Sequence, residues 1–434
     1  MPNRILIANR GEIALRILRA CQKLGKKTVA IYTAVDANLP HLDLADDTVC
    51  VSHYLDANDI VMAGLTRRCD AVHPGYGLLS ENAAFAEQVE SSGMVFIGPS
   101  PQHISALGDK TAARKIFSGL DIPCIPGSVE AVSSVEEAFE VAAVLGYPLI
   151  IKAAFGGGGR GIRKVDSAAG LAEAFDVSVS EAEVGFGRSE VFVEKLIENA
   201  RHIEVQVLGD GKGGCVHLGT RDCSVQRRYQ KLVEECPAPN IDNVCLDALT
   251  EKCVEAMAKL GYRNVATLEF LHTPGEFFFL EVNTRLQVEH PVTEMVSGID
   301  LVAAQFQIAD SGVIPFTQES IHLVGHSIEC RILAEDAAGL AGPGEIMGLR
   351  LPGGPGIRFD SHLYVGYRVP HQYDSLVGKL VVHAEDREMA LARLKQALNE
   401  LRIDGIPTNI ERLKRLTSDS TFMNVKFHTN WNPQ

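Results

Sequence analysis

A run of glycines carries the clearest chemical signal in this sequence. Four consecutive glycines, at 156–159, separate two predicted strands at 147–154 and 162–165, and Lys152 precedes them. Glycines let backbone N–H groups surround phosphate oxygens, and a neighbouring cation adds positive charge. The run is neither a Walker A loop, which needs Gly-Lys before Ser or Thr, nor a dinucleotide fingerprint, which needs a following helix. It predicts a mobile flap over a nucleotide, with a flexible surface hairpin as the alternative.

Two predicted strands, at 266–271 and 277–283, bring acidic and amide side chains together. Side chains alternate between the faces of a strand, so Glu281 and Asn283 share a face, and Glu269 lies almost opposite Glu281 in the hairpin. Buried carboxylates this close repel each other unless a cation neutralises them. Oxygen ligands of this kind suit Mg²⁺ or Mn²⁺. We therefore expect a metal site that bridges substrate phosphates, the alternative being a solvated acidic face.

Two charged segments extend this chemistry. Arg285 and Glu289 follow the expected metal ligands, and an arginine there can hold a planar anion while the glutamate acts as a base. The basic run at 221–231 is either a solvated face or an anion clamp beside the phosphate site. His290 is interpreted as structural.

The elements that must position these groups change in kind along the chain. Predicted strands at 4–8, 28–32, 71–72 and 95–97, with a helix at 12–24 and another opened by Ser80, indicate a mostly parallel sheet. A compact α+β segment follows, and strands dominate from residue 202 onward. The expected fold class is α/β, with these divisions: an N-terminal domain 1–97, a helical linker 98–124, a lid with the glycine run 125–196, and a C-terminal unit 197–434.

Composition excludes several classes of protein. The chain has 434 residues, a formal net charge of −14 and 46% hydrophobic residues, which together exclude a disordered chain and disfavour broad nucleic-acid binding. Its longest apolar stretch, 141–151, is too short to span a bilayer, and the start lacks a secretory signal. The ten cysteines form no C-x-x-C pair, as expected for reduced thiols. We expect a cytoplasmic protein that binds neither membrane nor nucleic acid.

Several long motifs are similar to those of biotin carboxylase, the ATP-grasp component of the biotin-dependent carboxylases. They occur in the family's order and cover essentially the whole chain. The motifs lie at 7–14, 73–82, 108–110, 152–161, 221–224, 281–294 and 329–331. The resemblance implies an ATP-grasp fold and an enzyme that carboxylates biotin on a carrier protein, using ATP and bicarbonate. This is the first half-reaction of a carboxylase such as acetyl-CoA carboxylase.

The resemblance also implies roles for individual residues. The nucleotide-contacting positions are Lys110, Lys152, Gly158, Gly159, Glu194, Lys195, Ile197, His202, Tyr229 and Leu271, together with Glu269 and Glu281. The ligands of two Mg²⁺ or Mn²⁺ ions are Glu269, Glu281 and Asn283. The bicarbonate site comprises Lys231, Arg285, Gln287, Val288 and Arg331, and Tyr76, Gly77 and Arg331 face biotin. The implied catalytic residues are Lys231, Arg285, Glu289 and Arg331. In the implied mechanism Glu289 deprotonates bicarbonate, which attacks the γ-phosphorus of ATP to give carboxyphosphate. Carboxyphosphate decays to CO₂ and phosphate, the phosphate takes the ureido proton of biotin, and Arg331 stabilises the resulting enolate.

The family further implies a biotin carboxyl carrier protein, a carboxyltransferase and a possible homodimer. The chain lacks the Met-Lys-Met tripeptide that carries biotin in this family, so we expect it to act on a carrier in trans, either as a stand-alone subunit or as part of a longer carboxylase. Another ATP-grasp ligase would share the metal ligands but would not need Arg285, Glu289 or Arg331. A non-catalytic ATP-binding subunit is the second alternative. The final acyl acceptor stays open.

Overall fold

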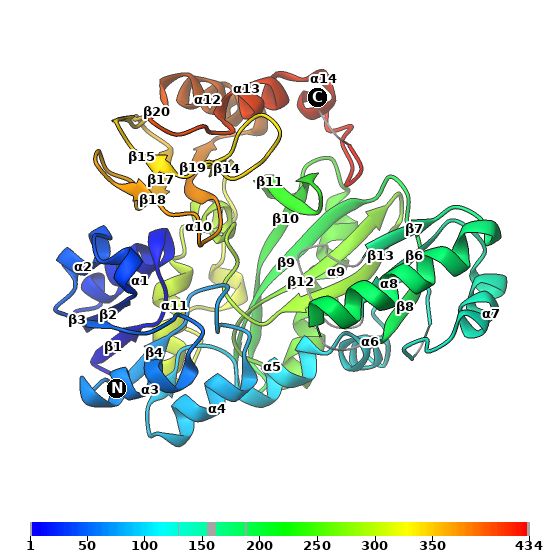
Figure 1. Cartoon of the computed structure of the whole chain (residues 1–434), viewed down its shortest axis with the longest axis horizontal. Coiled ribbons are helices and arrows are strands. Elements are labelled where there is room, and N and C mark those ends of the chain that lie inside the picture. Colours follow the sequence, from blue (N-terminus) through cyan, green and yellow to red (C-terminus); the bar gives the residue numbers. More distant parts are fainter. Residues whose placement is uncertain (1, 129, 154–161, 187–188, 432–434) are drawn as a thin grey trace.

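The N-terminal unit is a five-stranded parallel sheet covered on both faces. The computed structural model describes residues 2–128, 130–153, 162–186 and 189–431, and the unit lies at the blue end of the chain in Figure 1. The strand order is β3-β2-β1-β4-β5. The strands are β1 (Arg4–Ile7), β2 (Lys27–Tyr32), β3 (Asp47–Cys50), β4 (Ala71–His73) and β5 (Val95–Phe96), and the helices are α1 (Gly11–Lys23), α2 (Pro40–Leu44), α3 (Ala57–Thr66) and α4 (Ala83–Ser91), with a 3₁₀ turn η1 (Ala34–Asp36).

Alternation along β1 explains why both faces are covered. Ile5 and Ile7 pack with Ile17 of α1, whereas Leu6 packs on the opposite face with Phe85 of α4. The predicted parallel sheet is thus confirmed. The helix expected to open at Ser80 begins instead at Ala83, because the side chain of Asn82 accepts a hydrogen bond from the backbone N–H of Phe85 at 2.9 Å.

Two short helices connect this unit to the lid. They are α5 (Pro101–Gly108) and α6 (Lys110–Ser118), and both lie within the predicted helical linker 98–124. The Asp109 carboxylate caps α6 by accepting the backbone N–H groups of Thr111 and Ala112, at 2.8 and 2.9 Å. This cap fixes the start of the helix at Lys110, one of the predicted nucleotide contacts.

The lid is a small α+β unit with its own core. Its antiparallel sheet has the order β7-β6-β8, formed by β6 (Leu149–Ala153), β7 (Ile162–Val165) and β8 (Val191–Lys195). The helices α7 (Val135–Leu145) and α8 (Leu171–Phe186) and the 3₁₀ turn η2 (Ala168–Gly170) complete it. Leu149, Phe175 and Val193 pack together in a core separate from those of the other units. The lid lies at the right of Figure 1, beyond the large sheet.

An eight-stranded antiparallel sheet forms the centre of the molecule. Its order is β13-β12-β9-β10-β11-β14-β19-β17. The strands are β9 (Arg201–Asp210), β10 (Cys215–Arg227), β11 (Gln230–Cys236), β12 (Arg263–Thr273), β13 (Glu276–Asn283), β14 (His326–Leu333), β17 (Ile357–Ser361) and β19 (Leu376–Ala384). Strands from distant parts of the sequence therefore lie next to one another, as β11 and β14 do.

Helices pack against this sheet and complete the C-terminal part. They are α9 (Asn243–Lys259), α10 (His290–Ser297), α11 (Leu301–Ser311), the 3₁₀ turn η3 (Gln318–Ser320), α12 (Arg387–Glu400), α13 (Ile410–Ser418) and α14 (Ser420–Met423). Two small two-stranded sheets pair β15 (Gly344–Glu345) with β18 (Arg368–Val369) and β16 (Gly348–Arg350) with β20 (Arg402–Asp404). Among the described residues, none of the helices has the length and apolar character needed to cross a membrane. The ten cysteines are all free thiols.

Candidate active site

One cavity of about 640 Å³ lies between the N-terminal unit, the lid and the large sheet. Most of the predicted site residues line it. They are Tyr76, Gly77, Lys110, Lys152, Ile197, His202, Tyr229, Lys231, Glu269, Leu271, Glu281, Asn283, Arg285, Gln287, Val288, Glu289 and Arg331. The cavity has the size of a nucleotide-binding pocket and combines apolar walls with converging charges.

Among the predicted nucleotide contacts that the structure describes, Glu194 and Lys195 do not line the cavity. Gly158 and Gly159 lie outside the described residues. Glu194 is buried on β8, where its carboxylate accepts from Lys152 Nζ at 2.6 Å. Lys195 Nζ donates to the backbone carbonyl of Tyr147 at 3.0 Å. Glu194 therefore acts on the site through Lys152.

The acidic pair forms as the strand alternation predicts. Glu269 and Glu281 are register partners on β12 and β13, next to a β-bulge. Asn283 Nδ2 donates to the Glu269 carboxylate at 2.8 Å, while its Oδ1 accepts from Arg285 Nη2 at 2.9 Å. Lys110 Nζ lies 3.6 Å from the Glu281 carboxylate. Glu281 is the accessible member of the pair, with a side chain 35% exposed against 6% for Glu269.

Lys231 joins three buried carboxylates at the centre of the cavity. Its Nζ donates to Glu269 at 2.9 Å, to Glu289 at 2.8 Å and to Glu204. Burial acts to lower the pKa of Lys231, but the carboxylates outweigh it and hold the pKa well above its ordinary value. A fixed ammonium charge therefore stands beside the expected metal ligands.

Glu289 is held between two cations. In addition to Lys231, Arg331 Nη2 donates to the Glu289 carboxylate at 3.0 Å, and Arg331 Nε donates to Glu234 at 2.6 Å. Burial acts to raise the pKa of Glu289, but the nearby charges, led by Lys231, lower it to about 2. Glu289 is consequently ionised at neutral pH, as a base must be.

Arg285 faces the same cavity from the turn after β13. Its Nε lies 3.0 Å from the carboxylate of Glu81, and its Nη1 donates to the Leu286 carbonyl at 3.2 Å. The guanidinium is thereby fixed between the N-terminal unit and the large sheet, in the position to bind a planar anion.

The predicted biotin-facing residues come from the N-terminal unit and from β14. The hydroxyl of Tyr76 donates to the carboxylate of Glu12, which also pairs with Lys379 Nζ at 2.9 Å. Lys379 Nζ lies 5.7 Å from the centre of the Tyr76 ring. These contacts fix the tyrosine, while Gly77 and Arg331 line the cavity beside it.

Several groups that support the site had no individual role predicted from the sequence, and Arg221 was considered only as part of the basic run at 221–231. Arg221 is fully buried on β10 and donates to Glu204 at 2.9 Å, so the basic run begins inside the sheet. The alternation of apolar and polar residues across 215–227 is the signal that could have identified this strand. Its charged residues, however, are typical of an exposed surface. Glu12, Glu81, Glu204, Glu234 and Lys379 are the other supporting groups. His290 is buried, and its Nδ1 lies 2.7 Å from the Gln287 carbonyl, which agrees with a structural role.

Sequence-family profiles match almost the whole chain. The biotin carboxylase N-terminal domain matches residues 1–104, the ATP-binding domain of the carbamoyl-phosphate synthase L chain matches 109–315, and the biotin carboxylase C-terminal domain matches 329–433. The biotin carboxylase of Haemophilus influenzae is 49% identical over 97% of this chain and 96% of that protein. The biotin carboxylase of Pseudomonas aeruginosa is 48% identical, again over 97% of this chain and 96% of that protein.

Solved structures agree with this assignment. A biotin carboxylase from Campylobacter jejuni, described as a complex with β,γ-ATP, has a TM-score of 0.97 and 45% identity, and the match covers 99% of this chain and 98% of that one. The biotin carboxylase domain dimer of the Hydrogenobacter thermophilus 2-oxoglutarate carboxylase, in complex with MgADP, ADP and bicarbonate, has a TM-score of 0.97 and 41% identity over 99% and 97% of the two chains. The chain therefore belongs to the biotin carboxylase family and is an ATP-grasp ligase that carboxylates biotin.

Proposed function

We propose that this chain activates bicarbonate as carboxyphosphate with the γ-phosphate of ATP and then carboxylates biotin on a separate carrier protein. The observation that carries the proposal is Glu289, a buried carboxylate held between Lys231 and Arg331 beside the Glu269–Glu281 pair. A base, an anion site and a phosphate-side metal site are thus adjacent, as in-line attack on a phosphoryl group requires.

The residues present fit a divalent cation at the acidic pair. Glu269, Glu281 and Asn283 offer hard oxygen ligands, and the half-exposed Glu281 carboxylate reaches the cavity with Lys110 Nζ 3.6 Å away. We propose that they bind one or two Mg²⁺ or Mn²⁺ ions, whose chemistry is to neutralise the phosphate charge of ATP. Lys110 and Lys152 contribute further positive charge, and Ile197, His202, Tyr229 and Leu271 surround the rest of the nucleotide.

Bicarbonate competes with Glu289 for the same cations. An anion bound at Lys231, Arg285 and Arg331, next to Gln287 and Val288, shares their positive charge. The charges that hold the pKa of Glu289 to about 2 are then divided between two anions, so the carboxylate becomes a stronger base on substrate binding. Glu289 takes the proton, and the bicarbonate oxygen attacks the γ-phosphorus. The bond from this phosphorus to the bridging β,γ oxygen breaks, so ADP leaves and carboxyphosphate forms.

Biotin is carboxylated on the Arg331 side of the cavity. Carboxyphosphate gives CO₂ and phosphate, and the phosphate takes the ureido proton of biotin. The enolate oxygen that forms needs a fixed cation, which Arg331 supplies. The deprotonated ureido nitrogen then attacks CO₂, so the N–C bond of carboxybiotin forms as the enolate returns to the ureido carbonyl. Glu234 holds the Arg331 guanidinium in place, while Tyr76 and Gly77 lie beside it.

The experiment is an ATP hydrolysis assay with free biotin. We expect ADP release that depends on bicarbonate and increases with biotin, and loss of both dependences in Glu289→Gln. Another ATP-grasp ligase would hydrolyse ATP without a requirement for bicarbonate. An ATP-binding subunit without activity would bind nucleotide and release no ADP with any carrier; either result would contradict the proposal.

The partners and the division of the chain belong to the same proposal. We infer a biotin carboxyl carrier protein, a carboxyltransferase and a homodimer, the last because the Hydrogenobacter thermophilus relative is described as a dimer. The domain divisions remain 1–97, 98–124, 125–196 and 197–434, supported by the separate core of the lid. The ten free thiols favour the cytoplasm.

A further inference from the structure

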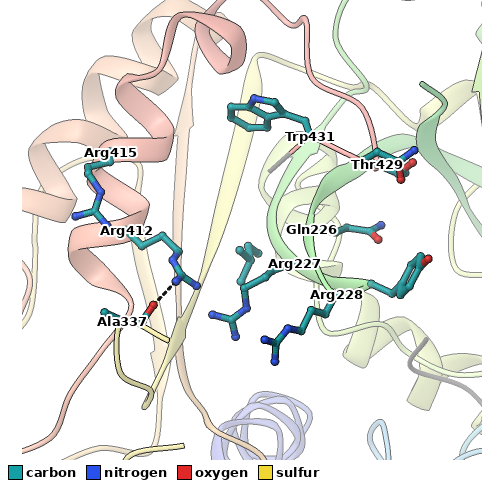
Figure 2. Close-up of a pocket in the computed structure, with 11 residues that line it drawn as sticks. Gln226, Arg227, Arg228, Ala337, Arg412, Arg415, Thr429 and Trp431 are labelled. Atoms are coloured by element: carbon teal, nitrogen blue, oxygen red, sulfur yellow. Dashed lines mark hydrogen bonds between the residues drawn. The ribbon is translucent and has the colours of Figure 1, made fainter. Parts of the chain in front are cut away.

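A second cavity, of about 500 Å³, lies between α13 and the turn that joins β10 to β11. Four arginines line it: Arg227 from the end of β10, Arg228 from the turn, and Arg412 and Arg415 from one face of α13. Figure 2 shows Arg412 and Arg227 extending into the same space from opposite sides, with Trp431 above them. We call this cavity the arginine pocket. So dense a group of cations is unexpected in a chain of net charge −14.

The charges of the arginine pocket are only partly compensated by the protein. Arg227 pairs with Glu335 at 2.5 Å, and Arg412 Nη2 donates to the Ala337 carbonyl at 2.6 Å. Within the described part of the chain, Arg228 and Arg415 form no ion pair. Arg227 Nη1 and Arg412 Nη1 are buried without an acceptor among the same described residues. Guanidinium donors therefore outnumber the acceptors at this place.

Electrostatic repulsion among the arginines of the pocket agrees with this excess of donors over acceptors. The pKa of Arg412 is lowered by burial and by the charges of Arg227 and Arg415, with partial compensation from Glu335 and Asp336. An additional anion would relieve this repulsion. The repulsion among these guanidinium groups therefore favours the binding of an anion between them.

The backbone also holds this arrangement in uncommon conformations. Arg228 and Tyr229 have φ angles of 50° and 64°, in the left-handed region that bulky residues rarely occupy. Gly339 has φ of 80°, and a Cβ there would lie 2.5 Å from Arg227 Nη1. The turn and the glycine together keep the Arg227 and Arg228 side chains at the pocket.

We propose that the arginine pocket binds a small molecule with at least two anionic groups, either phosphates or carboxylates. Guanidinium groups recognise both through paired N–H donors, and the volume suits a metabolite. Gln226, Tyr229, Thr429 and Asn430 line this pocket and also the catalytic cavity, so the two sites are neighbours. The four arginines have no role in the proposed catalytic chemistry, and the two cavities share only part of a wall. Anion binding in the arginine pocket is therefore a property separate from catalysis.

The test uses calorimetry with inorganic tripolyphosphate and with citrate, which distinguish the phosphate source from the carboxylate source. Trp431 is the only tryptophan in the chain, so its fluorescence reports occupancy of this pocket. We expect saturable binding of at least one probe with a change in fluorescence. Arg412→Gln/Arg415→Gln raises the Kd of that probe at least tenfold, and Arg228→Gln raises it in the same direction without touching α13.

Two controls locate the binding. Arg368→Gln removes the same charge at an exposed position on β18 and leaves the Kd unchanged. The double variant Lys110→Gln/Lys152→Gln weakens the nucleotide site of the catalytic cavity. We expect the probe to bind the arginine pocket of this variant with the same change in Trp431 fluorescence. Absence of saturable binding by both probes, an unchanged Kd in the folded double arginine variant, or loss of the signal with the two lysines would each overturn the proposal.

Discussion

At the scale of residues, the two carboxylates of the acidic pair have different surroundings. Glu269 accepts hydrogen bonds from Lys231, Asn283 and Gln287, so protein donors already neutralise it. Glu281 faces the cavity, and Lys110 Nζ is the cation paired with it among the described residues, at 3.6 Å. Removing the charge of Glu281 should therefore affect metal and nucleotide binding more than it affects folding.

Glu281→Gln tests this distinction. We expect kcat to fall by roughly 10²–10³-fold, the cost of losing one electrostatic contact to the reacting phosphate, with a melting temperature close to that of the wild type. Steady-state ADP release and thermal melting measure the two quantities. Glu276→Gln, an exposed position on the same strand, should retain both. Near-normal turnover of Glu281→Gln would exclude Glu281 as a metal ligand.

At the scale of elements, α12 is fixed to the large sheet by a buried ion pair. Arg387 Nε and Nη2 donate to the Glu235 carboxylate of β11 at 2.7 and 2.9 Å, and His326 Nε2 lies 2.8 Å from the same group. Burial acts to raise the pKa of Glu235, but His326 and Arg387 lower it from 4.5 to about 2. Folding therefore stabilises the ionised carboxylate.

This shift predicts a pH-dependent contribution to stability. The contribution is complete above the unfolded-state pKa of 4.5, amounts to on the order of 3 kcal/mol, and is lost as the pH falls toward 2. Urea unfolding should show a deficit for Glu235→Gln at pH 7 that shrinks between pH 5 and pH 3. Glu255→Gln, at an exposed helical pair with Lys259, serves as the control and should show little deficit at any pH. A deficit for Glu235→Gln that does not change with pH would rule out the ion pair as its cause.

Elements with a simple pattern were predictable and elements with buried charge were not. The strand β13 lies within one residue of its predicted start, and β7 has the predicted bounds, because alternation marks them in the sequence. The strand β10 was missed because Arg221 looks like a surface residue until Glu204 lies beside it. The acidic pair could be predicted from one hairpin. The contacts of Glu289 with Lys231 and Arg331 could not, because they depend on the order of distant strands.

At the scale of the whole molecule, buried ion pairs attach the N-terminal unit to the rest of the chain. Arg16 of α1 bonds Glu294 of α10 at 2.6 Å and Asp300, the cap of α11, at 2.5 Å. Lys23, one end of the same helix, also reaches Asp300, at 3.3 Å, but its side chain is 65% exposed. The two cations therefore share a partner and differ in burial.

Substituting Arg16 and Lys23 separately measures how much burial adds to the stabilising effect of each ion pair. Arg16→Gln removes the buried bonds to Glu294 and Asp300, although Glu294 keeps Arg358 at 2.8 Å, and should cost about 1.5–3 kcal/mol of unfolding free energy. Lys23→Gln removes a solvent-screened contact and should cost less than about 1 kcal/mol. Chemical denaturation of both variants gives the comparison. Equal losses would show that the interface does not depend on the buried pair.

The hydrogen bond from Tyr76 to Glu12 and the ion pair of Glu12 with Lys379 determine what happens when the chain is divided into fragments. One pocket wall is shared by residues near both ends of the chain, and Lys231 and Arg331 complete it from the middle of the sheet. No single unit can hold a working site by itself. A chain cut in an exposed loop between units should be inactive as separate fragments and regain activity only when the fragments reassemble, which makes fragment complementation a direct assay of assembly.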